Sequence, residues 1–272
     1  MIMTTSMAIG QEEDINPIVS EDDTVEVGAG ATPAATEGAC EPYELRLATS
    51  PVPPQSPTRL KTFDRDLTRI PKTAKVVAFG DSQVGTWPQE QFSATFDGKR
   101  TVNLGLNGDY VQNALWRLQD PRMASIDPSL VIVIIGGANL SQYSGCAIAA
   151  GTIQMLDRIR ETWPNAYILR IDITPRGSDF TQRDDRRIEA NALVRAHMAN
   201  MPNTGVVNFD SVLTCDQYLK PQPWYFSIQQ MFSGGGSPCE NYRDDMTHLT
   251  KVGYDVFGRE LLNALAQLNV EY

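Results

Sequence analysis

Histidine is scarce in this chain, whose 272 residues contain only His197 and His248. Cysteine is scarce as well, and no two cysteines form a CxxC pair: they are Cys40, Cys146, Cys215 and Cys239. Structural zinc sites need closely spaced Cys and His ligands. The sequence therefore predicts no metal site.

Long apolar runs are also missing. The longest, residues 130–135, is far shorter than the ~20 residues that a membrane-spanning helix needs. The first ten residues show neither a basic segment nor a continuous apolar segment of the kind that secretory signals have. We expect no membrane partner and see no signal peptide in this chain.

Basic residues are absent from the first 45 positions, which hold ten Asp and Glu side chains. The net charge of −10 therefore comes from this segment, and the remainder is neutral. An acidic segment rich in Ala, Thr, Gly and Pro buries too little apolar surface to order itself. Residues 50–57 (SPVPPQSP) then have the composition of an extended linker. The sequence predicts a disordered tail and linker over 1–57 and one domain over 58–272, and without a basic stripe we expect no nucleic-acid partner.

Short β-branched runs alternate with helical patterns along the predicted domain. The predicted strands are 75–79, 100–104, 130–135, 166–173 and 205–209. Helical spacing of apolar residues occurs within 84–92, from 109 onward, and in 153–163, 184–201 and 261–268. Five alternations predict a three-layer α/β domain with a parallel sheet.

The first strand ends at Gly80-Asp81-Ser82, so a serine stands where a strand gives way to a helix. Ligands of open α/β sheets bind at this edge. A hydroxyl there can act as a nucleophile, with helix N–H groups directed at the charge it creates. Because Asp and Ser are also common helix N-caps, the tripeptide alone fits either role.

Other strand ends supply the remaining parts of a serine-hydrolase site. Asp245 and His248 follow the fifth strand and are three residues apart, so Asp245 can accept from one imidazole nitrogen while the other faces Ser82. A simpler interpretation of Asp245 is a cap for the last helix. His197 lies inside a predicted helix, where a structural role is favoured.

Gly108 follows the second strand and Asn139 the third. A glycine N–H can approach a ligand closely, and an asparagine adds an NH₂ donor. With the N–H of Ser82 they would form an oxyanion hole of three donors. Taken singly, each could also be an ordinary turn glycine or loop asparagine.

Four blocks of the sequence, GDSQV, NLGLNGD, GGAN and DMTH, occur in the order found in the SGNH hydrolases, also called GDSL esterases and lipases. The stretch NLGLNGDYVQNALWRL resembles the platelet-activating-factor acetylhydrolase-like branch, including Asp109, Trp116 and Arg117. The resemblance covers about residues 74–260. It implies a flavodoxin-like order of five parallel strands and no cofactor.

The resemblance also implies roles for particular residues. Ser82 would be the nucleophile, Asp245 and His248 would complete the triad, and Gly108 and Asn139 would be oxyanion donors. Two positions depart from the family: Gln83 replaces its Leu, and Leu140 stands where many members have Asp. Neither is catalytic in the family, so the departures bear on substrate preference.

Together these features predict a serine esterase that cleaves short, acetyl-like acyl esters of a small molecule or carbohydrate. An acyltransferase that uses the same acyl-enzyme is the alternative among enzymes, and an inactive carbohydrate-binding relative is the alternative among binding proteins. The oligomeric state does not follow from the sequence.

An aromatic insertion, residues 211–243, precedes the DMTH block, and we expect Trp224 and Tyr225 to contact substrate. Alternatively, the aromatic residues of this insertion form a hydrophobic cluster that Cys215 and Cys239 hold in place. These two cysteines fit a disulfide or two buried thiols equally well, and Cys40 is a candidate partner for Cys146. Cysteine placement favours a periplasmic or secreted protein.

Overall fold

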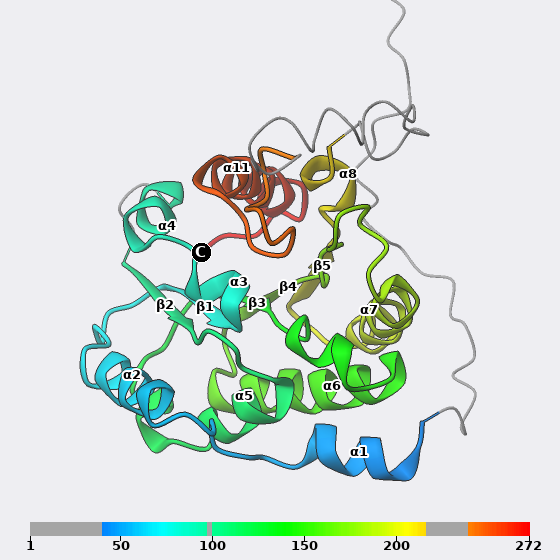
Figure 1. The fold of residues 1–272 in the computed structure, drawn as a ribbon. Coiled ribbons are helices and arrows are strands. Elements are labelled where there is room, and N and C mark those ends of the chain that lie inside the picture. The colour runs from blue at the N-terminus through cyan, green and yellow to red at the C-terminus, as the bar shows by residue number, and fades with distance from the viewer. Residues whose placement is uncertain (1–39, 97–99, 216–238) are drawn as a thin grey trace, which may run out of the picture.

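The computed structural model describes residues 40–96, 100–215 and 239–272. Within them, five parallel strands form one sheet in the order β2-β1-β3-β4-β5 (Figure 1). The strands are β1 (Val76–Gly80), β2 (Thr101–Gly105), β3 (Leu130–Ile134), β4 (Tyr167–Ile171) and β5 (Thr204–Val207). This is the flavodoxin-like order, so the predicted three-layer fold is confirmed.

Helices cover both faces of the sheet (Figure 1). One face carries α5 (Val111–Arg117), α6 (Gly145–Thr162) and α7 (Asp184–Met198), with α2 (Pro57–Thr68) at its edge. The other face carries α3 (Ser82–Gly85), α4 (Gln89–Thr95), α8 (Asp210–Leu213) and α11 (Lys251–Gln267). Along the chain, the 3₁₀ turn Pro121–Ser125 precedes β3 and the 3₁₀ turn Ala138–Ser141 follows it.

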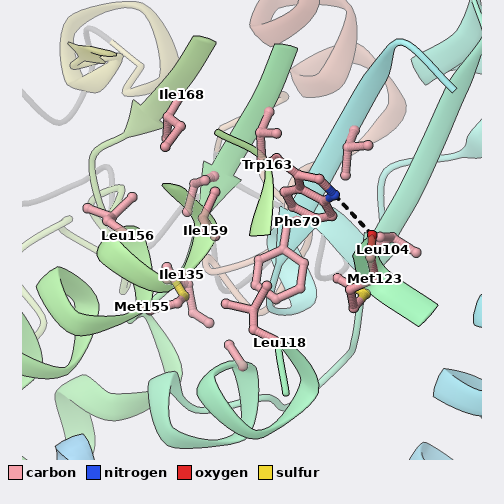
Figure 2. Close-up of a cluster of buried hydrophobic side chains, with 14 of the residues drawn as sticks. Phe79, Leu104, Leu118, Met123, Ile135, Met155, Leu156, Ile159, Trp163 and Ile168 are labelled. Atoms are coloured by element: carbon pink, nitrogen blue, oxygen red, sulfur yellow. Dashed lines mark hydrogen bonds between the residues drawn. The ribbon is translucent and has the colours of Figure 1, made fainter. Parts of the chain in front are cut away.

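The inner strands β1 and β3 are buried on both faces, which explains why they are apolar throughout, whereas the edge strand β2 alternates between buried and half-buried residues. In β1, Val77 and Phe79 face the core under α5 and α6, while Val76 and Ala78 face the core under α4 and α11. Figure 2 shows the first of these cores, in which the Trp163 indole N–H donates to the carbonyl oxygen of Met123 at 3.0 Å.

The helix predicted over 84–92 is two helices. The first, α3, ends at Gly85, and α4 begins at Gln89 after Pro88. A proline disfavours helical backbone at the residue before it, so one helix cannot run through Trp87 and Pro88. The helix predicted over 184–201 ends at Met198.

The folded part of the chain begins earlier than the predicted boundary near residue 58. Residues Pro42–Thr49 form α1, and α2 begins at Pro57 (Figure 1). Ala48 of α1 is fully buried against α6. At the N-terminus of α6, Glu44 accepts from the backbone N–H and the hydroxyl of Ser144 at 2.9 and 2.6 Å. These tertiary contacts order a segment whose composition alone predicts disorder, while residues 1–39 lie outside the described residues.

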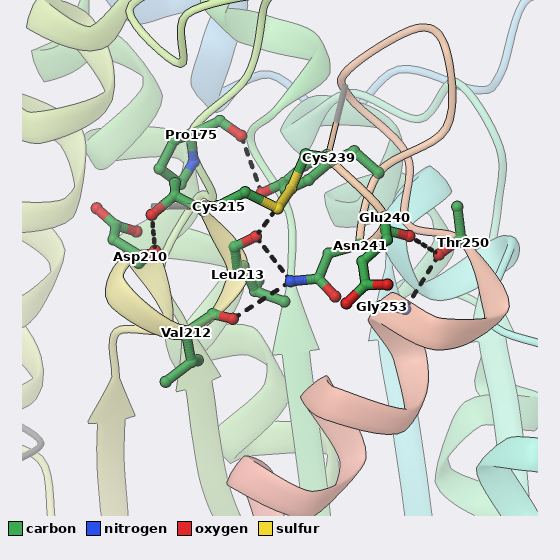
Figure 3. Close-up of a disulfide and its surroundings, with 12 residues drawn as sticks. Pro175, Asp210, Val212, Leu213, Cys215, Cys239, Glu240, Asn241, Thr250 and Gly253 are labelled. Atoms are coloured by element: carbon green, nitrogen blue, oxygen red, sulfur yellow. Dashed lines mark hydrogen bonds between the residues drawn. A yellow bond between two sulfur atoms is a disulfide. The ribbon is translucent and has the colours of Figure 1, made fainter. Parts of the chain in front are cut away.

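Both cysteine pairs are disulfides. Cys40–Cys146 joins a residue two positions before α1 to the start of α6. Cys215–Cys239, with 5.6 Å between Cα atoms, ties the residues just after α8 to the segment that leads into α11 (Figure 3). Two disulfides are compatible with an extracellular location. Across the described ranges, no helix combines the length and apolarity that crossing a membrane requires.

The packing of α1 on α6 can be tested at Gly151. A Cβ at this position would lie 2.5 Å from the backbone oxygen of Ala48. Gly151→Ala should therefore lower the free energy of unfolding by about 1–3 kcal/mol, although alanine favours a helix over glycine by ~1 kcal/mol. Denaturant titration measures this, with Gln154→Ala on the exposed side of α6 as the control. Equal stability of the two variants would contradict the docking of α1.

Candidate active site

Ser82 is the first residue of α3, directly beyond the carboxyl end of β1. Gly80 ends the strand at a place where a Cβ would lie 1.8 Å from the backbone oxygen of Ile134, so only glycine fits. Asp81 is buried, and its carboxylate caps α3 by accepting from the N–H of Gln83 at 3.0 Å. The backbone around Ser82 is thus fixed by β3 on one side and by a cap on the other.

His248 lies in a tight loop that precedes α11. The bridge between Tyr242 and Leu249 closes the loop, and the N–H of Arg243 donates to the carbonyl oxygen of His248 at 2.8 Å. Thr250 caps α11 by accepting from the N–H of Gly253 at 3.1 Å. Asp245 is therefore not the cap of the last helix.

Asp245 binds the loop and the imidazole at once. One carboxylate oxygen accepts from the N–H groups of Thr247 and His248, each at 2.9 Å, and the other lies 2.7 Å from Nδ1 of His248. Burial raises the pKa of Asp245, but the hydrogen bonds from His248 and Thr247 together lower it by more. The pKa therefore lies below its usual value. The carboxylate therefore stays charged at neutral pH and is neutralised only in more acidic solution.

The structure brings Ser82, His248 and Asp245 together. Nε2 of His248 lies 2.8 Å from Oγ of Ser82. With the Nδ1 proton held by Asp245, Nε2 is free to accept the serine proton. His197 of α7 contacts Asp157 of α6 at 3.0 Å and does not line the cavity beside Ser82.

Gln83 also connects the two halves of the site, a role that its departure from the family pattern did not reveal. Its side-chain NH₂ donates to the carbonyl oxygen of Thr247 at 2.5 Å. Its backbone oxygen accepts from the Tyr254 hydroxyl of α11 at 2.6 Å. The serine turn and the histidine loop are therefore held against each other by contacts on both sides.

Gly108 and Asn139 lie at the same edge of the sheet. Gly108 follows β2 with a φ of +77°, a conformation that favours glycine. Asn139 is fully buried: its side-chain oxygen accepts from the N–H of Val111 at 3.0 Å, and its NH₂ donates to Gln112 at 3.1 Å. Within the described part of the chain, neither residue hydrogen-bonds to Ser82. Gln112 is a partner that sequence reasoning missed.

A cavity of about 190 Å³ opens beside Ser82 and His248. Ile134, Ile135 and Ile173 supply its apolar walls, and Arg176 lines it while donating to the carbonyl oxygen of Gly137. Gly108 and Asn139 do not line this cavity. It therefore extends from the serine toward β3 and β4.

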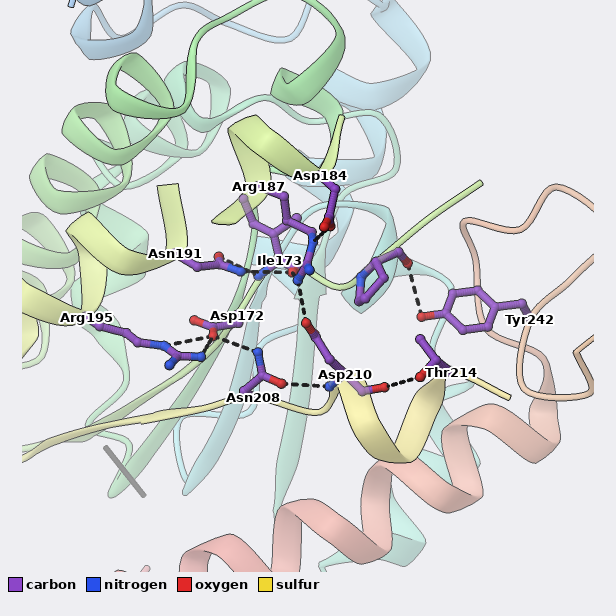
Figure 4. A network of polar contacts seen from close by, with 11 residues as sticks. Asp172, Ile173, Asp184, Arg187, Asn191, Arg195, Asn208, Asp210, Thr214 and Tyr242 are labelled. Carbon is purple, nitrogen blue, oxygen red and sulfur yellow. Dashed lines mark hydrogen bonds and ion pairs between the residues drawn. The ribbon is translucent and has the colours of Figure 1, made fainter. Parts of the chain in front are cut away.

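A polar network anchors the segment that leads to His248 (Figure 4). Arg187 of α7 pairs with Asp184 at 2.5 Å and with Asp210 of α8 at 2.7 Å. The Tyr242 hydroxyl donates to the carbonyl oxygen of Pro175 at 3.2 Å. Burial raises the pKa of this tyrosine, so it remains a donor. Together with the Cys215–Cys239 disulfide, these contacts fix the base of the histidine loop.

Trp224 and Tyr225, the predicted substrate contacts, lie outside the described residues, as do all of residues 216–238. Their role stays a prediction. Among the residues that the structure describes, no cluster of three or more His, Cys, Asp or Glu side chains could hold a metal ion.

A Ser–His–Asp chain at the switch point of a parallel sheet is typical of the serine hydrolases. A sequence model of the GDSL-like lipase/acylhydrolase family matches residues 72–256. The chain belongs to this family and is an ester hydrolase of the GDSL type.

Individual proteins show the same relationship. The chain is 26% identical over 198 residues to the platelet-activating factor acetylhydrolase IB subunit alpha1 of Pongo abelii. The aligned region covers 72% of this chain and 78% of the relative. Its fold is similar to that of a platelet activating factor from Streptococcus pneumonia (TM-score 0.58, 16% identity, 76% of this chain and 90% of that one). A GDSL-like lipase from Bacteroides thetaiotaomicron is also similar (TM-score 0.56, 14% identity, 76% and 97%).

Proposed function

We propose that this chain is a serine esterase that uses Ser82, His248 and Asp245 as its triad. The observation that carries the proposal is the continuous contact from Ser82 Oγ through the imidazole to Asp245, at 2.8 and 2.7 Å. Ser82 attacks the ester carbonyl while Nε2 of His248 takes its proton and passes it to the leaving alcohol. Asp245 holds the imidazole in the required tautomer, and water then hydrolyses the acyl-enzyme through the same base.

The developing oxyanion is stabilised by the backbone N–H groups of Ser82 and Gly108 and by the NH₂ of Asn139. Ser82 is the first residue of a helix, so its N–H has no partner within that helix. Asn139 has two N–H bonds, and Gln112 accepts from its NH₂ through one hydrogen bond. The proposal assigns the second N–H of this buried amide to the substrate.

The acyl group is short and acetyl-like in this proposal. The cavity of about 190 Å³ beside Ser82 is small and has Ile134, Ile135 and Ile173 in its wall, which supports a short acyl chain. The names of the curated relatives describe acetylhydrolases. A carbohydrate-like alcohol is supported by the aromatic composition of the insertion at 211–243, and the two disulfides support a periplasmic or secreted enzyme.

The triad is tested by substitution. Ser82→Ala and His248→Ala should each lower kcat by about 10⁶-fold, and Asp245→Asn by about 10⁴-fold, because the serine and the base act as a unit that the carboxylate only orients. Hydrolysis of 4-nitrophenyl acetate measures this, with the exposed Ser178→Ala as control and thermal unfolding to verify folding. More than a tenth of normal activity in Ser82→Ala would refute the mechanism.

The oxyanion role of Asn139 makes a different prediction. Asn139→Ala should lower kcat by about 10² to 10³ with little change in KM, because the donor acts mainly in the transition state. It should also lower the free energy of unfolding by about 1–3 kcal/mol, since the N–H of Val111 loses its acceptor. Kinetics at a temperature where the variant is fully folded separate the two effects. An unchanged kcat there would exclude Asn139 from the oxyanion hole.

Substrate preference is tested with a series of acyl esters. We expect kcat/KM to be highest from acetyl to butyryl and to fall by at least about tenfold at octanoyl, because longer chains exceed the cavity. Acetylated sugars should be better substrates than acetylated alkyl alcohols. A preference for octanoyl esters would contradict the proposed acyl site. Faster release of the acyl group when a sugar acceptor is added would instead favour an acyltransferase. Absence of any turnover would favour an inactive carbohydrate-binding protein.

A further inference from the structure

The segment that carries α1 and α2 makes three hydrogen bonds to the turn at Gly108 and to the start of α5, which follows that turn. Arg59 of α2 donates from Nη1 to the carbonyl oxygen of Gly108 at 2.6 Å. Between the two helices, the N–H of Val52 donates to the carbonyl oxygen of Gln112 at 3.1 Å, and its own carbonyl oxygen accepts from Asn113 at 2.9 Å. Arg59 and Val52 both lie outside residues 72–256, the part that the family model matches.

At Gly108, the guanidinium of Arg59 occupies one side of the residue. A Cβ on Gly108 would lie 3.5 Å from Nη1. The same nitrogen is 3.7 Å from the carboxylate of Asp109, which is fully buried and pairs with Arg117 at 2.7 Å. Burial raises the pKa of Asp109 to about 6, while Arg117 and Arg59 oppose the shift. Arg59 therefore binds a backbone carbonyl and complements a buried charge at adjacent residues.

At Asn139 the segment acts through Gln112. The Gln112 side chain accepts from the NH₂ of Asn139 at 3.1 Å and donates to the Tyr143 hydroxyl at 3.1 Å. Its backbone oxygen is the acceptor for Val52. The N-terminal segment is thus two hydrogen bonds away from one donor and in direct contact with the other.

The segment is itself fastened to the body of the protein. Cys40–Cys146 and the contacts of Glu44 with Ser144 attach it to α6, and hydrogen bonds from Ser144 hold the pKa of Glu44 below its usual value. Phe63 and Leu67 of α2 are buried in the core beneath the sheet. Arg59 is therefore presented to Gly108 from a fixed helix, with about a quarter (23%) of its side chain exposed.

We propose that Arg59 is a positioning residue for the oxyanion hole: by holding the carbonyl of Gly108 it fixes the turn that presents the Gly108 N–H to the developing oxyanion. The inference rests on the proposed function, because Gly108 matters to turnover only if Ser82 attacks an ester. Arg59 does not touch the reacting atoms and acts through Gly108. Its effect is confined to the transition state, where the charge on the oxygen develops.

The test compares three variants in the full chain with 4-nitrophenyl acetate. Arg59→Gln should lower kcat by about tenfold with KM within about twofold of normal, a smaller loss than removal of a donor itself. Arg59→Lys, which retains a cation on the same helix, should restore at least about a third of the normal kcat. Arg65→Gln, on the same helix, where the Arg65 side chain pairs with its neighbour Asp66, should leave both constants unchanged.

Thermal unfolding of each variant shows that the comparison is made on folded protein. Equal kcat in Arg59→Gln and Arg65→Gln, or a loss that falls on KM instead of kcat, would overturn the inference and leave the proposed function standing. A loss that Arg59→Lys does not reverse would also overturn it. Failure of the wild-type chain to hydrolyse any ester of the acyl series would instead contradict the proposed function itself.

Discussion

The parallel pairing of β1 with β2 on one side and β3 on the other is the constraint on which the site depends. Parallel strands all end at the same edge of a sheet, and the helices that follow β1 and β3 lie on opposite faces, which opens the crevice where ligands bind. The pairing continues past the strands, since the N–H of Leu106 donates to the carbonyl oxygen of Gly80 at 3.0 Å. Ser82, Gly108 and Asn139 are thereby brought to one edge from three separate strand ends.

The sheet does not position the histidine, and the molecule uses other interactions for that. His248 lies 166 positions beyond Ser82, in a loop held by a disulfide at its base, by the Tyr242 hydroxyl, and by hydrogen bonds to Gln83 and Asp245. Each contact fixes a different part of the loop. A hydrogen bond of 2.8 Å between side chains so far apart in sequence requires this degree of support, because small displacements at an active site reduce rate strongly.

The sequence was sufficient to predict the strands, the three layers and the residues at the strand ends. Buried parallel strands have a distinctive apolar pattern, and the predicted bounds lie within two residues of those observed. The helix α1 could not be predicted, because its order comes from Ala48 against α6 and from a disulfide rather than from its own composition. Nor could the partners of Asn139, since Gln112 lies 27 positions away and only the fold brings it close. Both failures concern contacts between distant segments, which local patterns do not encode.

The central claim is that Ser82 is a nucleophile activated by His248. Its most direct test is covalent labelling with a fluorophosphonate, which reacts with an activated serine hydroxyl, followed by mass spectrometry of the digested protein. We expect a single adduct on the peptide that contains Ser82, and loss of this adduct in His248→Ala while that variant remains folded. Labelling at another serine, or equal labelling of Ser82 with and without the histidine, would contradict it.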